Sequence, residues 1–294
     1  MFKREGRKMK MVPLSKHISM FVSMILLFLP SWTNAFGVKY VDPKYKATAF
    51  LTISFPTSAI AFDSSENLYI ENSTDNGSGS VKILKLDAAN NYTTSSIYIS
   101  YSTSAHGVNG LAFNEFGSLF VSESNADKNS GLIREVDTAA LTVSKTIPLD
   151  SFRPTGIATD ASGNIFFPGR LSSDPDFGNI YKIDSMGVVH ILLAGVIGTG
   201  IGINNSGNIV VSTPGRDVSP LVSQSIYEYD SNTLKPSLIA TFDDDPVEEL
   251  TFDAEGDLYV IDHKMANRSQ TIIRLSQFST ISTLLGINLL LLSD

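Results

Sequence analysis

The chain has 294 residues, with 22 Lys+Arg against 30 Asp+Glu, a formal net charge of −8, 43% hydrophobic residues and no Cys. This length is sufficient for one large all-β domain with a packed core, and the absence of Cys excludes disulfides, thiolate metal sites and a Cys nucleophile. The acidic balance argues against binding of nucleic acid through a basic face.

Residues 1–35 differ in composition from the rest of the chain. They contain six Lys or Arg residues and one acidic residue, and an apolar run at 18–29 is followed by Pro30 and a small-residue stretch at 33–35. This layout is typical of a secretory signal peptide. The apolar run is also shorter than the roughly 20 residues that cross a bilayer as a helix.

We therefore expect cleavage after Ala35, export to the periplasm or the extracellular space, and no stable membrane span afterwards. Membrane anchoring by the uncleaved N-terminal segment is the alternative. Cleavage would leave residues 36–294 as one domain with 16 basic and 29 acidic residues, a net charge of −13. A surface this acidic favours cations or basic partners over anionic ones.

An alternating pattern at 46–53 predicts a strand. Five segments that are similar to one another follow this strand. Each segment has a short apolar run, a polar turn and an apolar or aromatic run, which is the pattern of a β-hairpin. The segments are 58–71, 109–122, 155–168, 199–212 and 248–261. Their turn positions, spaced by 51, 46, 44 and 49 residues, are Glu66, Gly117, Gly163, Gly207 and Gly256.

Further strands follow each hairpin. An alternating third strand is predicted at 81–86, 131–136, 179–183, 225–229 and 271–275, and a fourth strand at, for example, 96–100, 141–145 and 188–192. Four antiparallel strands in each repeat indicate the blade of a β-propeller. We expect the strand at 46–53 to complete the last blade by pairing with C-terminal strands, which removes exposed sheet edges.

The number of blades is left between two values. Dividing the mature length by the repeat spacing gives between five and six, and we prefer six, with five as the alternative. The apolar stretch 284–292 is predicted to be the outer strand of the last blade. The other interpretation, a membrane-tethering tail, is too short to span a bilayer.

The repeat resembles those of NHL-repeat propellers, best seen at 109–121 and 155–167. It is also similar to the regucalcin/gluconolactonase and virginiamycin B lyase-like propellers. The resemblance covers roughly residues 57–275 and concerns the residues that build hairpins. It therefore implies the fold much more specifically than an activity.

The position just before the first strand of each repeat should face the mouth of the central channel. It is occupied by Ser58, Asn109, Thr155, Thr199 and Glu248. In the regucalcin/gluconolactonase enzymes a Glu, an Asn and an Asp at this register hold a divalent cation. The resemblance therefore implies a cation site, for Ca²⁺ or a similar ion, at Asn109 and Glu248. Thr155 stands where the family has Asp, which weakens that site.

A lyase of the virginiamycin B type would need a His as a base near the cation. His106 precedes Asn109 and is the candidate base. The alternative is that His106 is a residue of a surface loop without a catalytic role. His190 lies in a predicted strand and His263 at a strand end, so both are interpreted as structural or exposed.

Charged residues elsewhere have both functional and structural interpretations. The acidic stretch 243–249 is either a Ca²⁺ loop or a solvated loop. Arg170 and Arg216, in similar contexts, are either a clamp for a carboxylate or phosphate or partners of surface acids; Arg153 also lies near a blade boundary. The repeated Asp residues at 63, 160 and 253 are assigned to turn chemistry.

Two functional hypotheses follow. The first is an exported, monomeric propeller that binds a protein or a small molecule at one face or at the channel mouth. The second is a divalent-cation-dependent lactonase or lyase that uses Asn109, Glu248 and His106.

Overall fold

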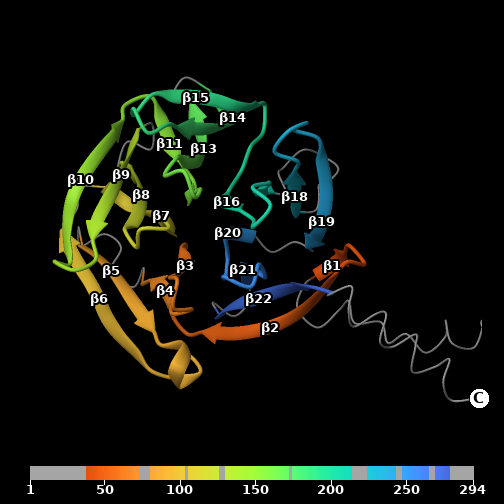
Figure 1. Cartoon of the computed structure of the whole chain (residues 1–294), viewed down its shortest axis with the longest axis horizontal. Coiled ribbons are helices and arrows are strands. Elements are labelled where there is room, and N and C mark those ends of the chain that lie inside the picture. Colours follow the sequence, from red (N-terminus) through yellow and green to blue (C-terminus); the bar gives the residue numbers. More distant parts are fainter. Residues whose placement is uncertain are drawn as a thin grey trace, which may run out of the picture.

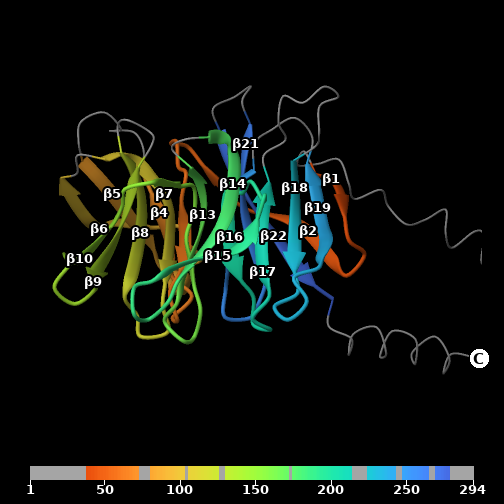
Figure 2. The same ribbon diagram turned by 90° about the horizontal axis from the view of Figure 1, so that it is seen from above.

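The computed structural model describes residues 38–72, 80–102, 105–125, 130–171, 174–213, 224–242, 247–264 and 269–278. These residues form antiparallel β-sheets and one short 3-10 helix, Ala88–Asn90. Five sheets are arranged like blades around a central axis (Figure 1). In the view turned by 90° the strands run across the thickness of this ring (Figure 2).

The first three blades are continuous in sequence. Blade 1, from the centre outward, is β3 (Ile60–Phe62), β4 (Leu68–Glu71), β5 (Ser80–Leu86) and β6 (Ser95–Ser102). Blade 2 is β7 (Ala105–Phe113), β8 (Leu119–Asn125), β9 (Gly131–Asp137) and β10 (Thr142–Leu149). Blade 3 has a divided inner strand, β11 (Phe152–Pro154) and β12 (Ala158–Thr159), followed by β13 (Ile165–Leu171), β14 (Asp174–Ile183) and β15 (Val189–Ala194).

The other two blades combine both ends of the described chain. Blade 4 is β16 (Gly200–Ile203), β17 (Ile209–Thr213), β18 (Gln224–Tyr229) and β19 (Pro236–Phe242), with β1 (Val38–Val41) added outside. Blade 5 is β20 (Val247–Phe252), β21 (Leu258–Lys264) and β22 (Ser269–Gln277), with β2 (Tyr45–Ile53) as its outer strand.

The ring closes as the sequence predicted. Strand β2 pairs antiparallel with β22, from Tyr45 opposite Gln277 to Ile53 opposite Gln270. Because β2 completes the blade begun by the C-terminal strands, the described residues form five blades, the smaller of the two expected numbers. The stretch 284–292 lies outside the described residues, and the outer position predicted for it in the last blade is held by β2.

The hairpin turns also have the predicted conformation. The backbone φ angle is positive at all five aligned turn positions, including +63° at Glu66, the one residue among them that is not glycine. Glu66 adds a contact across the ring closure, because the backbone N–H of Ala254 in blade 5 donates to its carboxylate at 2.9 Å. Asp63 and Asp160 accept backbone N–H groups two residues further on, as expected for turn residues.

The hydrophobic core consists of five clusters, and each cluster lies between two neighbouring blades. Blade 1 shows how alternation produces this arrangement. Ile60 and Phe62 pack against blade 5, whereas Ala59 and Ala61 face blade 2. Because successive side chains of a strand point to opposite faces, the inner strand of blade 1 contributes to the clusters on both of its sides and fixes this blade to its two neighbours.

The N-terminal segment 1–35 and the alternative of a membrane anchor lie outside the described residues. Within the part of the chain that the structure describes, no helix is long and apolar enough to cross a membrane.

Candidate binding site

The five residues predicted to face the channel mouth line one pocket. The pocket has a volume of about 170 Å³. Its lining consists of Ser58, Asn109, Thr155, Thr199 and Glu248, one from each blade, together with Arg153 and Arg170. A single buried water needs about 10–15 Å³ by this kind of measure, so the pocket can hold a group of several atoms.

Four of the five mouth residues bind the next blade to their own. Each neutral side chain donates a hydrogen bond to a backbone carbonyl of the following blade, and we call these four bonds the inter-blade staples. They run from Ser58 Oγ to Val108 O (2.7 Å), Asn109 Nδ2 to Pro154 O (2.8 Å), Thr155 Oγ1 to Gly198 O (2.8 Å) and Thr199 Oγ1 to Val247 O (2.9 Å). The accepting residue in each case directly precedes the next mouth residue.

Glu248 is the exception in this ring. An ionised carboxylate has no proton to donate, so Glu248 cannot form the fifth staple. The carbonyl of Thr57, which precedes Ser58, instead accepts a hydrogen bond from Gln270 Nε2 at 2.8 Å, and Thr57 N donates back to Gln270 Oε1 at 2.7 Å. At this level of the ring, blade 5 is therefore joined to blade 1 by Gln270 and Thr57.

Two arginines enter the pocket from blade 3. Arg153 on β11 and Arg170 on β13 are directly opposite each other in the antiparallel pairing, so both guanidinium groups come from one side of the ring. Arg153 is half-buried, and its Nε is buried without a hydrogen-bond partner among the described residues. A buried donor of this kind costs free energy unless a partner is supplied.

Below the mouth, the side chain of Glu249 closes the channel. The residues at this level in the other four blades are small: Ala59, Gly110, Gly156 and Gly200. Glu249 is 0% exposed and reaches from blade 5 to blade 3, where a Cβ built on Gly156 would lie 2.7 Å from its Oε2. A larger residue at 156 would therefore displace this carboxyl group. We call this arrangement the Glu249 plug.

Burial favours the protonated, uncharged form of the Glu249 plug. Burial raises the pKa of Glu249 well above its usual value of 4.5, and the negative charge of Glu248 raises it further, although the Ile157 N–H partly offsets the shift. The charged side chains among the residues that line the mouth pocket are Arg153, Arg170 and Glu248.

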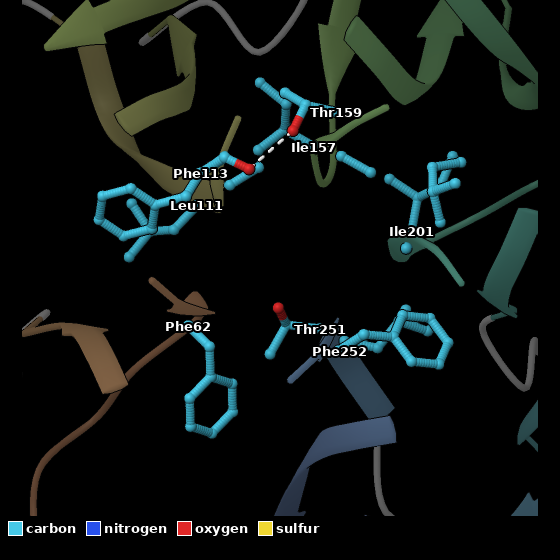
Figure 3. A pocket seen from close by; sticks show the side chains of 13 residues that line it. Phe62, Leu111, Phe113, Ile157, Thr159, Ile201, Thr251 and Phe252 are labelled. Atoms are coloured by element: carbon cyan, nitrogen blue, oxygen red, sulfur yellow. Dashed lines mark hydrogen bonds between the residues drawn. The ribbon is translucent and has the colours of Figure 1, made fainter. Parts of the chain in front are cut away.

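Beyond the plug, a second pocket of about 100 Å³ is lined by thirteen residues, most of them hydrophobic, among them Phe62, Leu111 and Phe252. The labelled side chains surround this space from all five blades, and Thr159 Oγ1 donates to the Phe113 carbonyl at its edge, at 2.8 Å (Figure 3). Charged side chains line the mouth pocket, whereas the residues that line this second pocket are uncharged.

The structure brings some of the predicted site residues together and leaves others undescribed. Asn109, Thr155 and Glu248 share the mouth pocket, with Asn109 and Thr155 engaged in staples. His106 lies in β7, but its side chain is outside the described set, as is that of His263 in β21. His190 is exposed in β15, and its Nε2 lies 2.9 Å from Asp184 Oδ2.

The clamp expected from Arg170 and Arg216 stays a prediction, because Arg216 lies outside the described residues. Among the described residues, Arg170 shares the pocket with Arg153. The sequence signal for Arg153 was its place near a blade boundary, but its pairing opposite Arg170 depends on the divided inner strand of blade 3. Of the acidic stretch 243–249, residues 243–246 are outside the described set, while Glu248 and Glu249 occupy the mouth and the plug.

A separate acidic group lies on the hairpin turn of blade 5. Carboxylate oxygens of Asp253, Glu255 and Asp257 come within 4.8 Å of one another. Arg274 neutralises part of this group, since its Nε donates to Asp257 at 2.6 Å and its guanidinium contacts Glu255 at 3.3 Å. Asp253 accepts the Tyr259 hydroxyl at 2.9 Å. These internal partners account for the cluster as part of the turn.

Comparison with known proteins supports the fold and goes no further. No protein-family model matches the chain, and no curated protein matches it in sequence. Among solved structures, the nidogen/laminin complex contains a chain with a TM-score of 0.50 and 15% identity, with 79% of this chain and 90% of that chain covered.

Two other solved structures belong to the enzymes and calcium-binding proteins that the repeat resembles. A gluconolactonase candidate has a TM-score of 0.49 at 12% identity, with 81% of this chain and 83% of that chain covered. A calcium-binding regucalcin from Agrobacterium tumefaciens has a TM-score of 0.43 at 15% identity, with 74% and 71% covered. The chain is an all-β propeller, and identities this low show the fold alone.

Proposed function

We propose that this propeller is a binding module for a small ligand that carries a carboxylate or a phosphate group, held at the channel mouth by Arg153 and Arg170. The observation that carries the proposal is the Arg153 guanidinium, which lines the pocket with a buried Nε that no described residue satisfies. Arginine presents planar, forked donors that match the two oxygens of a carboxylate or phosphate.

The acidic balance of the chain does not oppose this ligand. Charges on an exposed surface are screened over a Debye length of about 8 Å at physiological ionic strength. Groups inside the pocket therefore act on a ligand more strongly than distant surface charges do, and they include the Arg153 guanidinium with its buried Nε. The net charge alone favours cations, whereas this guanidinium favours an anion.

Calorimetric titration of the exported chain with inorganic phosphate and with acetate tests the proposal. Arg153→Met removes the guanidinium but keeps most of the aliphatic volume, and we expect it to weaken binding by about tenfold or more, since hydrogen bonds to charged groups contribute about 1.5–3 kcal/mol. Lys145→Met, on the exposed outer strand β10, removes one positive charge elsewhere and should leave affinity unchanged. Absence of saturable binding to the unmodified protein would refute the proposal.

A divalent-cation-dependent lactonase or lyase is the second candidate, because Asn109 and Glu248 line the same pocket. The Asn109 amide nitrogen is used in a staple, which leaves its oxygen as a ligand atom beside the Glu248 carboxylate. Ca²⁺ takes six to eight oxygen ligands, and nearby guanidinium groups repel it. Titration with Ca²⁺, Mg²⁺, Mn²⁺ and Zn²⁺ separates the candidates: saturable binding abolished by Asn109→Ala and Glu248→Ala supports the enzyme.

Export by the segment 1–35 is part of the same proposal. The support is the basic, apolar and small-residue order of that segment. Mass spectrometry of the protein recovered outside the cytoplasm is expected to give a chain that begins at Phe36, and a chain that retains Met1 would contradict cleavage.

A further inference from the structure

The backbone that carries Arg153 has little freedom of its own. Arg153 lies in β11 directly opposite Arg170 of β13, and the next residue, Pro154, lies opposite Gly169. Proline restricts its own φ angle to about −65° and keeps the residue before it in an extended conformation. The direction in which the Arg153 side chain leaves the backbone therefore depends on where Pro154 is held.

Blade 2 holds Pro154 by two contacts from outside its own blade. Pro154 is buried, and its carbonyl accepts the Asn109 Nδ2 staple at 2.8 Å. Its ring lies over Gly131 of β9, where an added Cβ atom would overlap the Pro154 Cδ. The glycine at 131 lets the proline approach blade 2 closely, and the Asn109 amide then fixes the carbonyl of the same proline.

A β-bulge in blade 2 places Asn109 for this contact. In the pairing of β7 with β8, Val108 lies opposite Glu123 and Gly110 lies opposite Ser122, so Asn109 is the extra residue between the two pairs. An extra residue of this kind bends the strand and redirects a side chain. Asn109 is thus positioned by blade 2, but it bonds to the backbone of blade 3.

We propose that Asn109 is a positioning residue of the anion site: its amide holds the Pro154 carbonyl and, through Pro154, the guanidinium of Arg153 in the mouth pocket. The inference rests on the proposed function and adds blade 2 to a site whose arginines come from blade 3. A group that is already held in its binding conformation loses less entropy when the ligand binds, so the affinity is higher.

This role differs chemically from that of a cation ligand. Positioning of Pro154 uses the amide N–H of Asn109, whereas a cation would be bound by the amide oxygen. The ring itself indicates which residue can replace the donor. The other three staples are formed by serine or threonine hydroxyls at the same repeat position, so a threonine at 109 is expected to form the bond to the Pro154 carbonyl.

Two substitutions of nearly equal shape therefore test the inference. Asn109→Thr supplies a hydroxyl donor, and Asn109→Val has the same branched shape without a donor. Both are titrated calorimetrically with inorganic phosphate as the exported protein. We expect Asn109→Val to weaken binding about fivefold, as for the loss of one neutral hydrogen bond, and Asn109→Thr to bind within about twofold of the unmodified protein.

Thr159→Val is the matched control. The Thr159 hydroxyl donates to the Phe113 carbonyl at 2.8 Å and also joins blade 3 to blade 2, but at the second pocket (Figure 3). Urea unfolding should show similar losses of stability for Thr159→Val and Asn109→Val, whereas only Asn109→Val should weaken phosphate binding. Equal losses of affinity would show that Asn109 acts only through the general stability of the junction, and would overturn the inference.

The outcomes distinguish this inference from the proposed function. Phosphate binding that depends on Arg153 but is unchanged in Asn109→Val would overturn the positioning role and leave the anion site standing. A loss of affinity in Asn109→Thr as large as about fivefold would also overturn it, and this comparison with the unmodified protein remains decisive if Asn109→Val does not fold. Absence of saturable phosphate binding to the unmodified protein would overturn both.

Discussion

The burial of Glu249 predicts the direction in which the stability of the protein changes with pH. The folded-state pKa of this carboxyl lies well above its usual value of 4.5, so the folded protein holds a proton that the unfolded chain releases. Its contribution to the free energy of unfolding is therefore complete below about pH 4.5 and is lost as the pH rises through the folded-state pKa. One proton of difference corresponds to about 1.4 kcal/mol per pH unit.

Glu249→Gln keeps the shape of the plug and removes the titration. We expect the variant to be more stable than the unmodified protein at neutral pH, by a margin that grows with pH between 4.5 and the folded-state pKa and is constant above it. Urea unfolding followed by circular dichroism at pH 5, 6, 7 and 8 measures this margin as a shift in midpoint. Circular dichroism is preferable because the single Trp, Trp32, lies in the segment expected to be removed.

A matched control is Glu115→Gln, at an exposed turn position of blade 2, which should change stability by no more than about 0.5 kcal/mol at any pH. Parallel stability curves for the unmodified protein and Glu249→Gln would show that the carboxyl is already ionised in the folded state. The description of a neutral plug below the mouth would then be wrong.

Three further predictions concern the contacts that hold the blades together. Thr155→Val removes one inter-blade staple and should lower the free energy of unfolding by about 1–3 kcal/mol, because a buried carbonyl loses its donor. The control Thr142→Val, on the exposed outer strand, should change the free energy of unfolding by less than about 0.5 kcal/mol. Equal effects of the two substitutions would contradict the staple. Gly156→Ala should lower the free energy of unfolding by about 1–3 kcal/mol, because the added methyl group overlaps the plug. In a Glu249→Ala background the same substitution should lower it by less, and a double-mutant cycle measures this difference. Removal of residues 1–53 deletes the outer strand of blade 5 and should abolish cooperative thermal unfolding, while removal of the expected leader alone should leave the midpoint unchanged.

Most of the fold could be predicted from the sequence because hairpins repeat local chemistry. The positive φ angles at the turns and the closure of blade 5 by residues 45–53 follow from Gly and Asp positions and from alternation. The blade number could not be settled by length, since it depends on whether the N-terminal strand joins an existing blade or helps to form another one. Pairing between distant strands decides that question.

The site was predictable only in part. The alignment of the repeats identified the residues that line the mouth, from Ser58 in blade 1 to Glu248 in blade 5. Such an alignment predicts where a residue lies but not which groups its side chain bonds to. It therefore did not distinguish staple residues from the one residue that cannot form a staple. The position that directly follows each mouth residue in the repeat alignment could have indicated the plug, because Glu249 occupies it in blade 5 and glycine or alanine occupies it in the other four blades. A charged residue at a repeat position that is otherwise occupied by small residues indicates a side chain that fills the channel.

The location of a bound oxyanion tests the central claim most directly. Crystals of the exported protein grown with arsenate, a phosphate analogue with an anomalous signal, would show where the anion binds. The account predicts an anomalous peak in the mouth pocket, within hydrogen-bonding distance of the guanidinium groups of Arg153 and Arg170. Crystals in which arsenate binds elsewhere and the mouth contains only solvent would contradict it.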